Sequence, residues 1–157
     1  MTYYQIYAFP VGKILVAEQD GNITHLTLEG CIDTSRMSRG DTPLLDRTAD
    51  ALRGYFAGER DAFGGLPLSP QGTPFQREVW QALCAIPYGQ TISYAQLAMA
   101  VGRPKAARAV GAANGKNPIF IIIPCHRVIG ANGSLTGFAY GIELKRSLLE
   151  IESMGNR

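Results

Sequence analysis

A cysteine and a histidine stand next to each other at Cys125 and His126, directly after Pro124 and before Arg127. Cysteine reacts as the thiolate, and at an ordinary pKa near 8.5 only about 3% of the thiol is ionised at neutral pH. Full ionisation would gain at most roughly 30-fold, so positioning of the electrophile must supply most of a large acceleration. The pair suits nucleophilic catalysis in which the histidine is the base.

A histidine base needs a third group that orients its ring. Glu143 and Glu152 are candidates, and spacing alone does not choose between them. Adjacent strand residues point to opposite faces, so Cys125 and His126 cooperate only if a turn after Pro124 rotates them together or a water bridges them. Cysteine hydrolases use the same residue types, and an inert buried cysteine is a further interpretation.

The segment before the cysteine is apolar and rich in β-branched residues, and it predicts a buried strand over residues 119–123. Pro124 cannot donate to a sheet ladder, so the strand should stop there. We therefore expect Cys125 on the turn that follows, held rigidly by a strand end that is anchored in the core.

The stretch between Glu78 and Glu143 contains no acidic residue. Its basic residues are Arg103, Lys105, Arg108, Lys116 and Arg127. Subtracting these five positive charges from the net charge of +2 leaves −3 for the rest of the chain. A one-signed stretch of this length predicts a surface for a polyanion such as nucleic acid, and a chance distribution of charge is the alternative interpretation.

Length and cysteine usage exclude several classes of protein. The 157 residues fit one domain, or one domain with a small second lobe. Cys31, Cys84 and Cys125 are far apart, and His25 and His126 are the only histidines, so we expect no disulfide framework, no metal site and no cofactor. No apolar run approaches the roughly 18 residues that span a bilayer, so we expect no membrane partner. We also expect a monomer in a reducing cytoplasm, where a thiol at Cys125 could stay free.

The first part of the chain predicts a small sheet with one helix. Three short segments rich in aromatic and β-branched residues, separated by turn residues, are typical of an antiparallel meander. These segments are residues 3–8, 13–18 and 22–28. Thr42 can then cap a helix that begins at Pro43 and ends before Gly58. We expect an N-terminal lobe over residues 1–70, with a glycine- and proline-rich linker over residues 59–72.

The second part, residues 73–157, is predicted to be mainly helical. Thr73-Pro74-Phe75-Gln76 and Ser93-Tyr94-Ala95-Gln96 are capping boxes. They open predicted helices over residues 74–85 and from Tyr94 to about Val101. Further helices are expected over residues 105–114 and from about 142 to 152. The chain is thus an α+β protein.

The predicted helices 94–101 and 105–114 flank a tight turn that contains glycine, which makes them a helix-turn-helix candidate. A regulator that discriminates sequences sets several polar side chains against base edges, whereas here Arg108 is almost alone. Gly111 costs about 1 kcal/mol against alanine inside a helix, so the small residues indicate close approach to a partner. Packing against neighbouring helices is the alternative. The residues concerned are Ala106, Ala107, Val110 and Ala113.

Several segments together match a known family. Around the cysteine they are Asn117-Pro118, Ile123-Pro124-Cys125-His126-Arg127-Val128 and Leu135-Thr136-Gly137. Elsewhere they are Thr73-Pro74-Phe75-Gln76, Ile86-Pro87-Tyr88-Gly89, Ser93-Tyr94 and Pro104 to Val110. The chain resembles the O6-alkylguanine-DNA alkyltransferases, also called methylated-DNA--protein-cysteine methyltransferases. The resemblance covers the second part closely and the first part only in layout.

The resemblance implies a helix-turn-helix of winged-helix type and direct-reversal DNA repair. One methyl or small alkyl group would pass irreversibly from O6 of guanine, or O4 of thymine, to Cys125 after the damaged nucleotide is flipped. The implied partner is double-stranded DNA that contains O6-alkylguanine, which places the protein at the nucleoid when bound. A recognition-only relative would lack the acceptor cysteine.

The resemblance also implies roles for single residues. His126 works through a water, Glu152 rather than Glu143 orients the imidazole, and Asn117 stabilises the turn. Tyr94 and Lys145 assist proton delivery to the departing guanine.

Two further groups of residues follow from the resemblance. Arg108 fills the base stack after flipping, while the small-residue helix lies along the minor groove. The implied DNA contacts are Ser93, Tyr94, Arg103, Lys105, Ala106, Arg108 and Lys116. The implied pocket residues are Pro124, Val128, Phe138, Ala139 and Tyr140. Phe138 stands where members often have tyrosine and Tyr140 where many have glycine, so Tyr140 is expected to narrow the pocket.

Overall fold

The computed structural model describes residues 1–135 and 138–155, and it begins with a four-stranded sheet in the order β3-β2-β1-β4. Strands β1 (Thr2–Phe9), β2 (Gly12–Gln19) and β3 (Asn22–Leu28) form the predicted antiparallel meander. Strand β4 (Ser38–Arg39) pairs in parallel with β1 and was not predicted, because two residues carry no alternating pattern.

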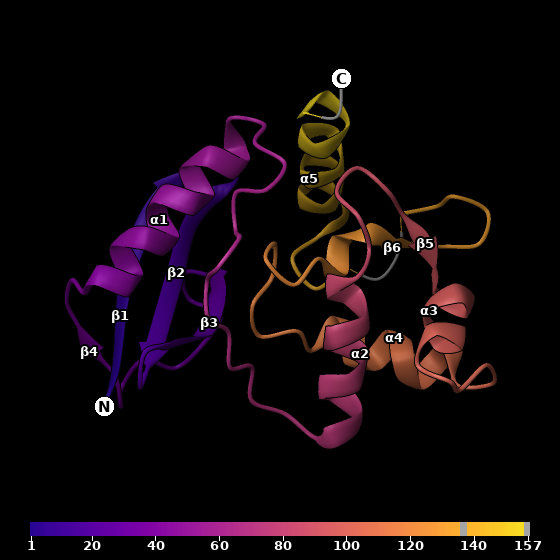
Figure 1. The fold of residues 1–157 in the computed structure, drawn as a ribbon, viewed down its shortest axis with the longest axis horizontal. Helices are drawn as coiled ribbons and strands as arrows, with labels where there is room; N and C mark the ends of the chain where they lie inside the picture. The colour runs from indigo at the N-terminus through magenta and orange to yellow at the C-terminus, as the bar shows by residue number, and fades with distance from the viewer. Residues whose placement is uncertain (136–137, 156–157) are drawn as a thin grey trace.

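Helix α1 (Pro43–Phe56) lies along one face of this sheet (Figure 1). It begins as predicted, with the Thr42 hydroxyl accepting a hydrogen bond from the backbone N–H of Leu45 at 3.2 Å. Leu45 and Leu52 of α1 pack with Ile14 and Val16 of β2 in the buried core. The α1 face and the sheet face therefore bury one another.

The second part consists of helices joined by turns. They are α2 (Pro74–Cys84), α3 (Tyr94–Ala100), α4 (Ala107–Gly115) and α5 (Ile142–Gly155). Both predicted capping boxes, at Thr73 and Ser93, are formed. Helix α4 begins two residues later than predicted, because residues 104–105 form a turn. Helices α3 and α4 pack against each other as the predicted helix pair.

The winged-helix detail stays a prediction. Strands β5 (Ile92–Ser93) and β6 (Val128–Ile129) lie beside the helix pair, and they pair in parallel rather than as a hairpin.

Gly111 is one of the small residues of α4. A Cβ there would meet the Tyr94 ring at an ordinary 3.5 Å, so close helix packing does not require this glycine.

The predicted strand over residues 119–123 is wrong. Only its first two residues pair with the sheet, and Ile121 adopts a left-handed backbone with φ of 71°. Local hydrogen bonds replace a ladder, from Ile122 N to Phe120 O at 2.8 Å and from Ile123 N to Ile119 O at 3.0 Å. The segment is buried as expected, but it is a compact turn because its apolar pattern does not distinguish a strand from a buried turn.

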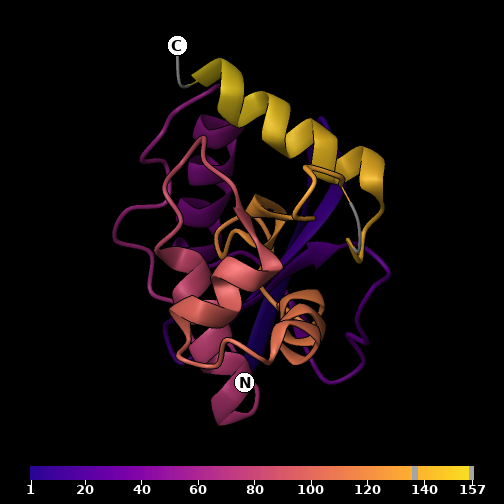
Figure 2. The same ribbon diagram turned by 90° about the vertical axis from the view of Figure 1, so that its right-hand side faces the viewer.

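The outer edge of β3 joins the two parts of the chain. Ile23 makes two backbone hydrogen bonds with residues 67–69, each 2.8 Å long. Leu26 makes two with residues 118–120, of 2.9 and 3.0 Å. The turn before Cys125 thus rests directly on the sheet. Helix α5 lies at the end of the molecule opposite the N-terminus, as the two ribbon views show (Figure 1, Figure 2).

Candidate active site

Cys125 opens a single 3₁₀ turn, η1 (Cys125–Arg127), as expected after Pro124. Its side chain is buried, with 4% of the residue exposed. Burial raises the pKa of the thiol to about 11, although the Asn117 amide, the Lys145 ammonium and nearby backbone N–H groups lower it. Only roughly 0.01% of such a thiol is ionised at neutral pH, so the proton must leave during the reaction.

His126 and Glu152 form a buried pair. His126 Nε2 lies 2.5 Å from Oε2 of Glu152 on α5, and the two residues are 0% and 1% exposed. Glu143, the other candidate, is exposed and pairs with Arg146. Of the two carboxylates considered, Glu152 is the one that contacts the imidazole.

Glu152 has two further side-chain partners that sequence reasoning missed. Arg127 donates from Nε to Oε1 at 2.7 Å and from Nη2 to Oε2 at 3.1 Å, while the Tyr55 hydroxyl donates to Oε2 at 2.7 Å. Burial raises the pKa of this carboxyl, but His126, Arg127 and Tyr55 outweigh it and lower the pKa to about 2. Glu152 is therefore ionised at neutral pH.

Arg127 is one of the five basic residues of the predicted polyanion-binding surface. For this residue the prediction is wrong, because its side chain is only 11% exposed and faces Glu152. The Cys-His-Arg order could have suggested this, since residues of one tight turn share their surroundings. Tyr55 carried no comparable signal. It stands on α1, 97 positions from Glu152, and its hydrophobic spacing marks it only as a core residue.

The imidazole of His126 is neutral in this setting. Burial lowers its pKa, and Arg127 and Lys145 add to this effect against the opposing influence of Glu152. A neutral ring that donates Nε2–H to the carboxylate has its acceptor lone pair on Nδ1. Nδ1 is buried and has no hydrogen-bond partner within residues 1–135 and 138–155. A base with a free lone pair thus lies next to the buried thiol in sequence.

Asn117 holds the turn that carries the cysteine. Its amide Nδ2 donates to Ile123 O at 2.7 Å, and its Oδ1 accepts from Ile119 N at 3.0 Å. These two bonds close the loop around Ile121, whose positive φ is strained for a β-branched residue. The amide side chain therefore stabilises a backbone that apolar residues would not adopt alone.

Tyr94 and Lys145 also lie within electrostatic reach of the thiol. Tyr94 is the first residue of α3, and burial and Cys125 raise its pKa. Lys145 of α5 is buried, donates from Nζ to Val128 O at 2.6 Å, and has a pKa lowered by burial. A lowered pKa makes the ammonium a readier proton donor.

Two family models match this chain over nearly its whole length. Residues 74–154 match "6-O-methylguanine DNA methyltransferase, DNA binding domain", and residues 2–70 match "6-O-methylguanine DNA methyltransferase, ribonuclease-like domain". The chain belongs to the 6-O-methylguanine DNA methyltransferase family.

Relatives in this methyltransferase family are similar end to end. The constitutive methylated-DNA--protein-cysteine methyltransferase of Bacillus subtilis is 49% identical, covering 97% of this chain and 96% of its own. The corresponding Methanosarcina barkeri protein is 46% identical over 96% of each chain. The solved structure of Mycobacterium tuberculosis OGT in complex with DNA superimposes with a TM-score of 0.90 at 43% identity, covering 98% of this chain and 94% of that one.

The loop over residues 138–140, which the family resemblance implies to line the pocket, contacts both parts of the chain. The Tyr140 ring lies 4.5 Å from the Phe120 ring, and the Tyr140 hydroxyl lies 2.7 Å from Oγ1 of Thr27 on β3. Phe138 lies 5.7 Å from Tyr140 between ring centres. Of the other implied pocket residues, Pro124 and Val128 are buried and Ala139 is exposed. Thr136 and Gly137 of the matched signature lie outside the described residues.

We predict that Tyr140→Gly speeds reaction with a benzyl-sized adduct about tenfold, because a pocket change of this size alters discrimination by roughly 1–3 kcal/mol. Rates with O6-benzylguanine and O6-methylguanine as free bases measure the effect. Tyr140→Phe keeps the ring and removes only the hydroxyl bonded to Thr27, so it should retain the wild-type preference. An unchanged rate for Tyr140→Gly would place this side chain outside the pocket.

The residues implied to contact DNA lie on and around α3 and α4. Arg108, Lys105 and Lys116 are exposed, and Ala106 is half-buried just before α4. Ser93 accepts a hydrogen bond from Gln96 N as the cap of α3. Arg103 is exposed but already engaged, with Nη2 3.7 Å from Glu78 Oε2 and its guanidinium 5.1 Å from the centre of the Phe75 ring.

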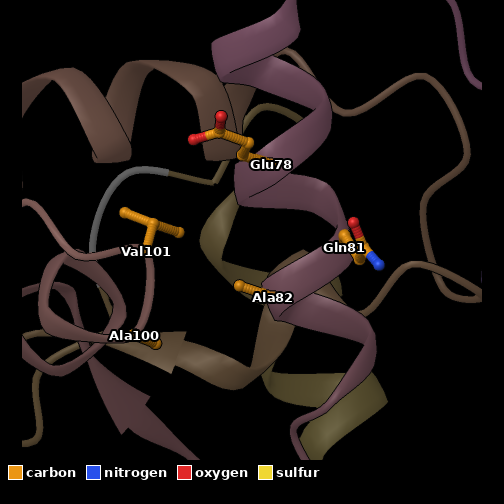
Figure 3. A pocket seen from close by; sticks show the side chains of 5 residues that line it. All are labelled: Glu78, Gln81, Ala82, Ala100 and Val101. Carbon is orange, nitrogen blue, oxygen red and sulfur yellow. The ribbon is translucent and has the colours of Figure 1, made fainter.

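One surface hollow lies outside this site. A hollow of about 340 Å³ lies between α2 and the end of α3 (Figure 3). It is lined by Glu78, Gln81, Ala82, Ala100 and Val101. None of these is a predicted site residue. Among the residues that the structure describes, no cluster of three His, Cys, Asp or Glu side chains could hold a metal ion, and no helix could cross a membrane.

Proposed function

We propose that this protein repairs alkylated DNA by direct reversal. One methyl or small alkyl group passes from O6 of guanine, or from O4 of thymine, to Cys125, and each protein molecule reacts once. The observation that carries this proposal is the buried neutral thiol beside a His126–Glu152 pair whose Nδ1 is an unpartnered acceptor among the described residues. Family membership supports it, because the relatives are named for the same transfer.

The proposed step uses one thiol, one base and one proton donor. His126 Nδ1 accepts the thiol proton through a water, the sulfur forms a bond to the alkyl carbon, and the bond from that carbon to O6 breaks. The bonding electrons stay with the guanine, which regains a proton at N1, delivered by Lys145 or Tyr94. The product thioether offers water no good leaving group, so the protein remains alkylated and needs no cofactor.

Burial of Cys125 favours flipping of the damaged nucleotide. A thiol that is 4% exposed cannot reach a base inside the duplex, and extrusion costs a few kcal/mol. Arg108 projects from α4, whose exposed face otherwise carries the small residues Ala109 and Ala112. A helix face that carries only small side chains fits the narrow minor groove, about 6 Å wide, better than the face of an ordinary helix does. We therefore infer that Arg108 fills the gap that the flipped nucleotide leaves in the base stack.

We predict that Arg108→Ala lowers repair in duplex DNA by about 10- to 100-fold, because the cost of extrusion is a few kcal/mol. Its reaction with a free O6-alkylguanine base should change less than about twofold, since no extrusion is needed there. Rates of alkyl transfer to Cys125 with both substrates provide the measurement. Equal losses on both would show that Arg108 does not assist flipping.

Lys105→Ala is the matched control for Arg108. Lys105 is also exposed and cationic, and it lies in the turn just before α4. Its removal should weaken DNA binding and reduce the salt dependence by about one counterion, without a specific loss in the flipping step. At saturating DNA the Lys105→Ala rate should match the wild-type rate.

The proposed function is tested by intact mass after incubation with duplex DNA that contains O6-methylguanine. The expected result is a gain of one methyl group per protein molecule and no further turnover. DNA binding with an unchanged protein mass would instead indicate a recognition-only protein. Multiple turnovers on peptide or ester substrates would indicate a cysteine hydrolase.

We also propose that residues 1–70 and 73–157 are separate domains, that the protein acts as a monomer, and that it works in the cytoplasm at the nucleoid. Support for the division comes from the separate matches to residues 2–70 and 74–154. Support for the location comes from the proposed DNA substrate and the free thiol that the reaction needs.

A further inference from the structure

Tyr55 links the N-terminal lobe to the buried cluster of charged and titratable side chains formed by His126, Arg127 and Glu152. Its hydroxyl donates to Oε2 of Glu152 at 2.7 Å, and that same oxygen faces Nε2 of His126. The ring is held by a stacked contact with Phe63 at 5.3 Å and an edge contact with Tyr88 at 6.4 Å. The donor is therefore fixed in direction by packing on α1 as well as by its acceptor.

We propose that Tyr55 is a positioning residue for alkyl transfer, through which the N-terminal lobe sets the basicity of His126. This inference rests on the proposed function and adds to it. The lobe that carries Tyr55 contains neither the acceptor cysteine nor the helix pair implied to bind DNA. The geometry gives it a part in the chemistry.

The physical reason is that Tyr55 and His126 compete for one carboxylate oxygen. A hydrogen bond from the phenol draws negative charge on Oε2 away from the imidazole, so Glu152 favours a protonated His126 less strongly. The phenol is always available as a donor, because burial and the Glu152 charge raise its pKa above the ordinary value. Tyr55 thus helps to keep His126 neutral and ready to accept the thiol proton.

The other charged groups around the pair do not replace this bond. Arg127 and Lys145 act on His126 from η1 and α5, and Tyr88 lies near Glu152 and Arg127. The Tyr88 hydroxyl donates to the backbone carbonyl of Ile151, not to the carboxylate. The titratable and charged groups that surround His126 and Glu152 are Tyr55, Tyr88, Cys125, Arg127 and Lys145, and Arg60 lies over the Tyr88 ring.

We predict that Tyr55→Phe moves the acid limb of the rate–pH profile upward by about half a pH unit, the size expected for one hydrogen bond to the carboxylate. The rate on the plateau should stay within about twofold of wild type, because neutral His126 remains the base there. The measurement is the rate of Cys125 alkylation by O6-benzylguanine free base from pH 4.5 to 8.5.

Tyr88→Phe is the matched control, since it removes a nearby hydroxyl that does not touch Glu152. Its acid limb should coincide with that of wild type. A second variant keeps the test valid if Tyr55→Phe loses stability. Tyr55→3-fluorotyrosine keeps the ring and strengthens the hydrogen-bond donor, so the acid limb of its rate–pH profile should move to lower pH. A role in packing alone would not produce shifts of opposite sign.

Unchanged acid limbs in both Tyr55 variants, with wild-type protein that gains the alkyl group, would overturn the inference. That result would leave the proposed function intact. Failure of the proposed function looks different, because the wild-type protein itself would then gain no mass from the benzylated base or from methylated DNA.

Discussion

Replacement of Cys125 by serine should abolish the gain of alkyl mass from methylated duplex DNA, slowing transfer by about 10⁴-fold or more. The serine hydroxyl is a weaker nucleophile than sulfur, and the neutral His126 base cannot compensate for this difference. The fold should persist, since oxygen replaces sulfur in the same buried volume. Intact mass and peptide mapping after reaction measure the outcome.

Cys84→Ser and Cys31→Ser are the matched controls. Both residues are free cysteines, and partial burial of the Cys84 thiol raises its pKa, which makes Cys84 a poor alternative acceptor. Both variants should gain mass at the wild-type rate. The assignment of Cys125 would be wrong if Cys125→Ser gained the same mass as wild type.

Glu152→Gln is expected to lower the free energy of unfolding at pH 7 by about 3 kcal/mol, because the pKa of this carboxyl falls from 4.5 to about 2 on folding. The amide also leaves the buried guanidinium of Arg127 without its counterion. Alkyl transfer should slow about 100-fold, since His126 loses the group that orients its ring. Denaturant unfolding and single-turnover kinetics measure the two effects.

The stability difference between wild type and Glu152→Gln should depend on pH. A carboxyl whose pKa is depressed in the folded state stabilises that state fully above pH 4.5. This stabilisation is lost as the pH falls from 4.5 towards 2, where the carboxyl becomes protonated in both states. The two unfolding free energies should therefore converge over this interval, and a constant difference would show that the charge is not responsible.

Glu143→Gln serves as the control for Glu152. Both are glutamates of α5, but the Glu143 side chain is 89% exposed and its partner Arg146 is also on the surface. Exposed ion pairs contribute little in water. This variant should leave stability and alkyl transfer unchanged within error, and equal effects of the two variants would argue against the buried cluster.

Local patterns were sufficient to predict much of the fold. The capping boxes at Thr73 and Ser93 appear because a hydroxyl and a glutamine three residues on satisfy free backbone N–H groups wherever such a helix begins. The meander likewise follows from alternation and turn residues. The carboxylate partner of His126 could be predicted only from the family resemblance, because spacing alone left Glu143 and Glu152 equivalent.

Long-range contacts account for what the sequence did not reveal. Tyr55 approaches Glu152 only after α1 and α5 have packed, and nothing in its own helix marks that contact. Ile121 illustrates the same limit in the backbone. Its β-branched side chain favours an extended conformation, yet the Asn117 clamp imposes a left-handed one.

The backbone bonds on the outer edge of β3 have a consequence for the solubility of partial chains. An unpaired strand edge offers free N–H and C=O groups to any other extended chain and promotes aggregation. In the intact protein, residues 67–69 and 118–120 occupy this edge through Ile23 and Leu26. A fragment that ends in the linker would leave the position opposite Leu26 open, so the turn that carries Cys125 also shields the sheet from self-association.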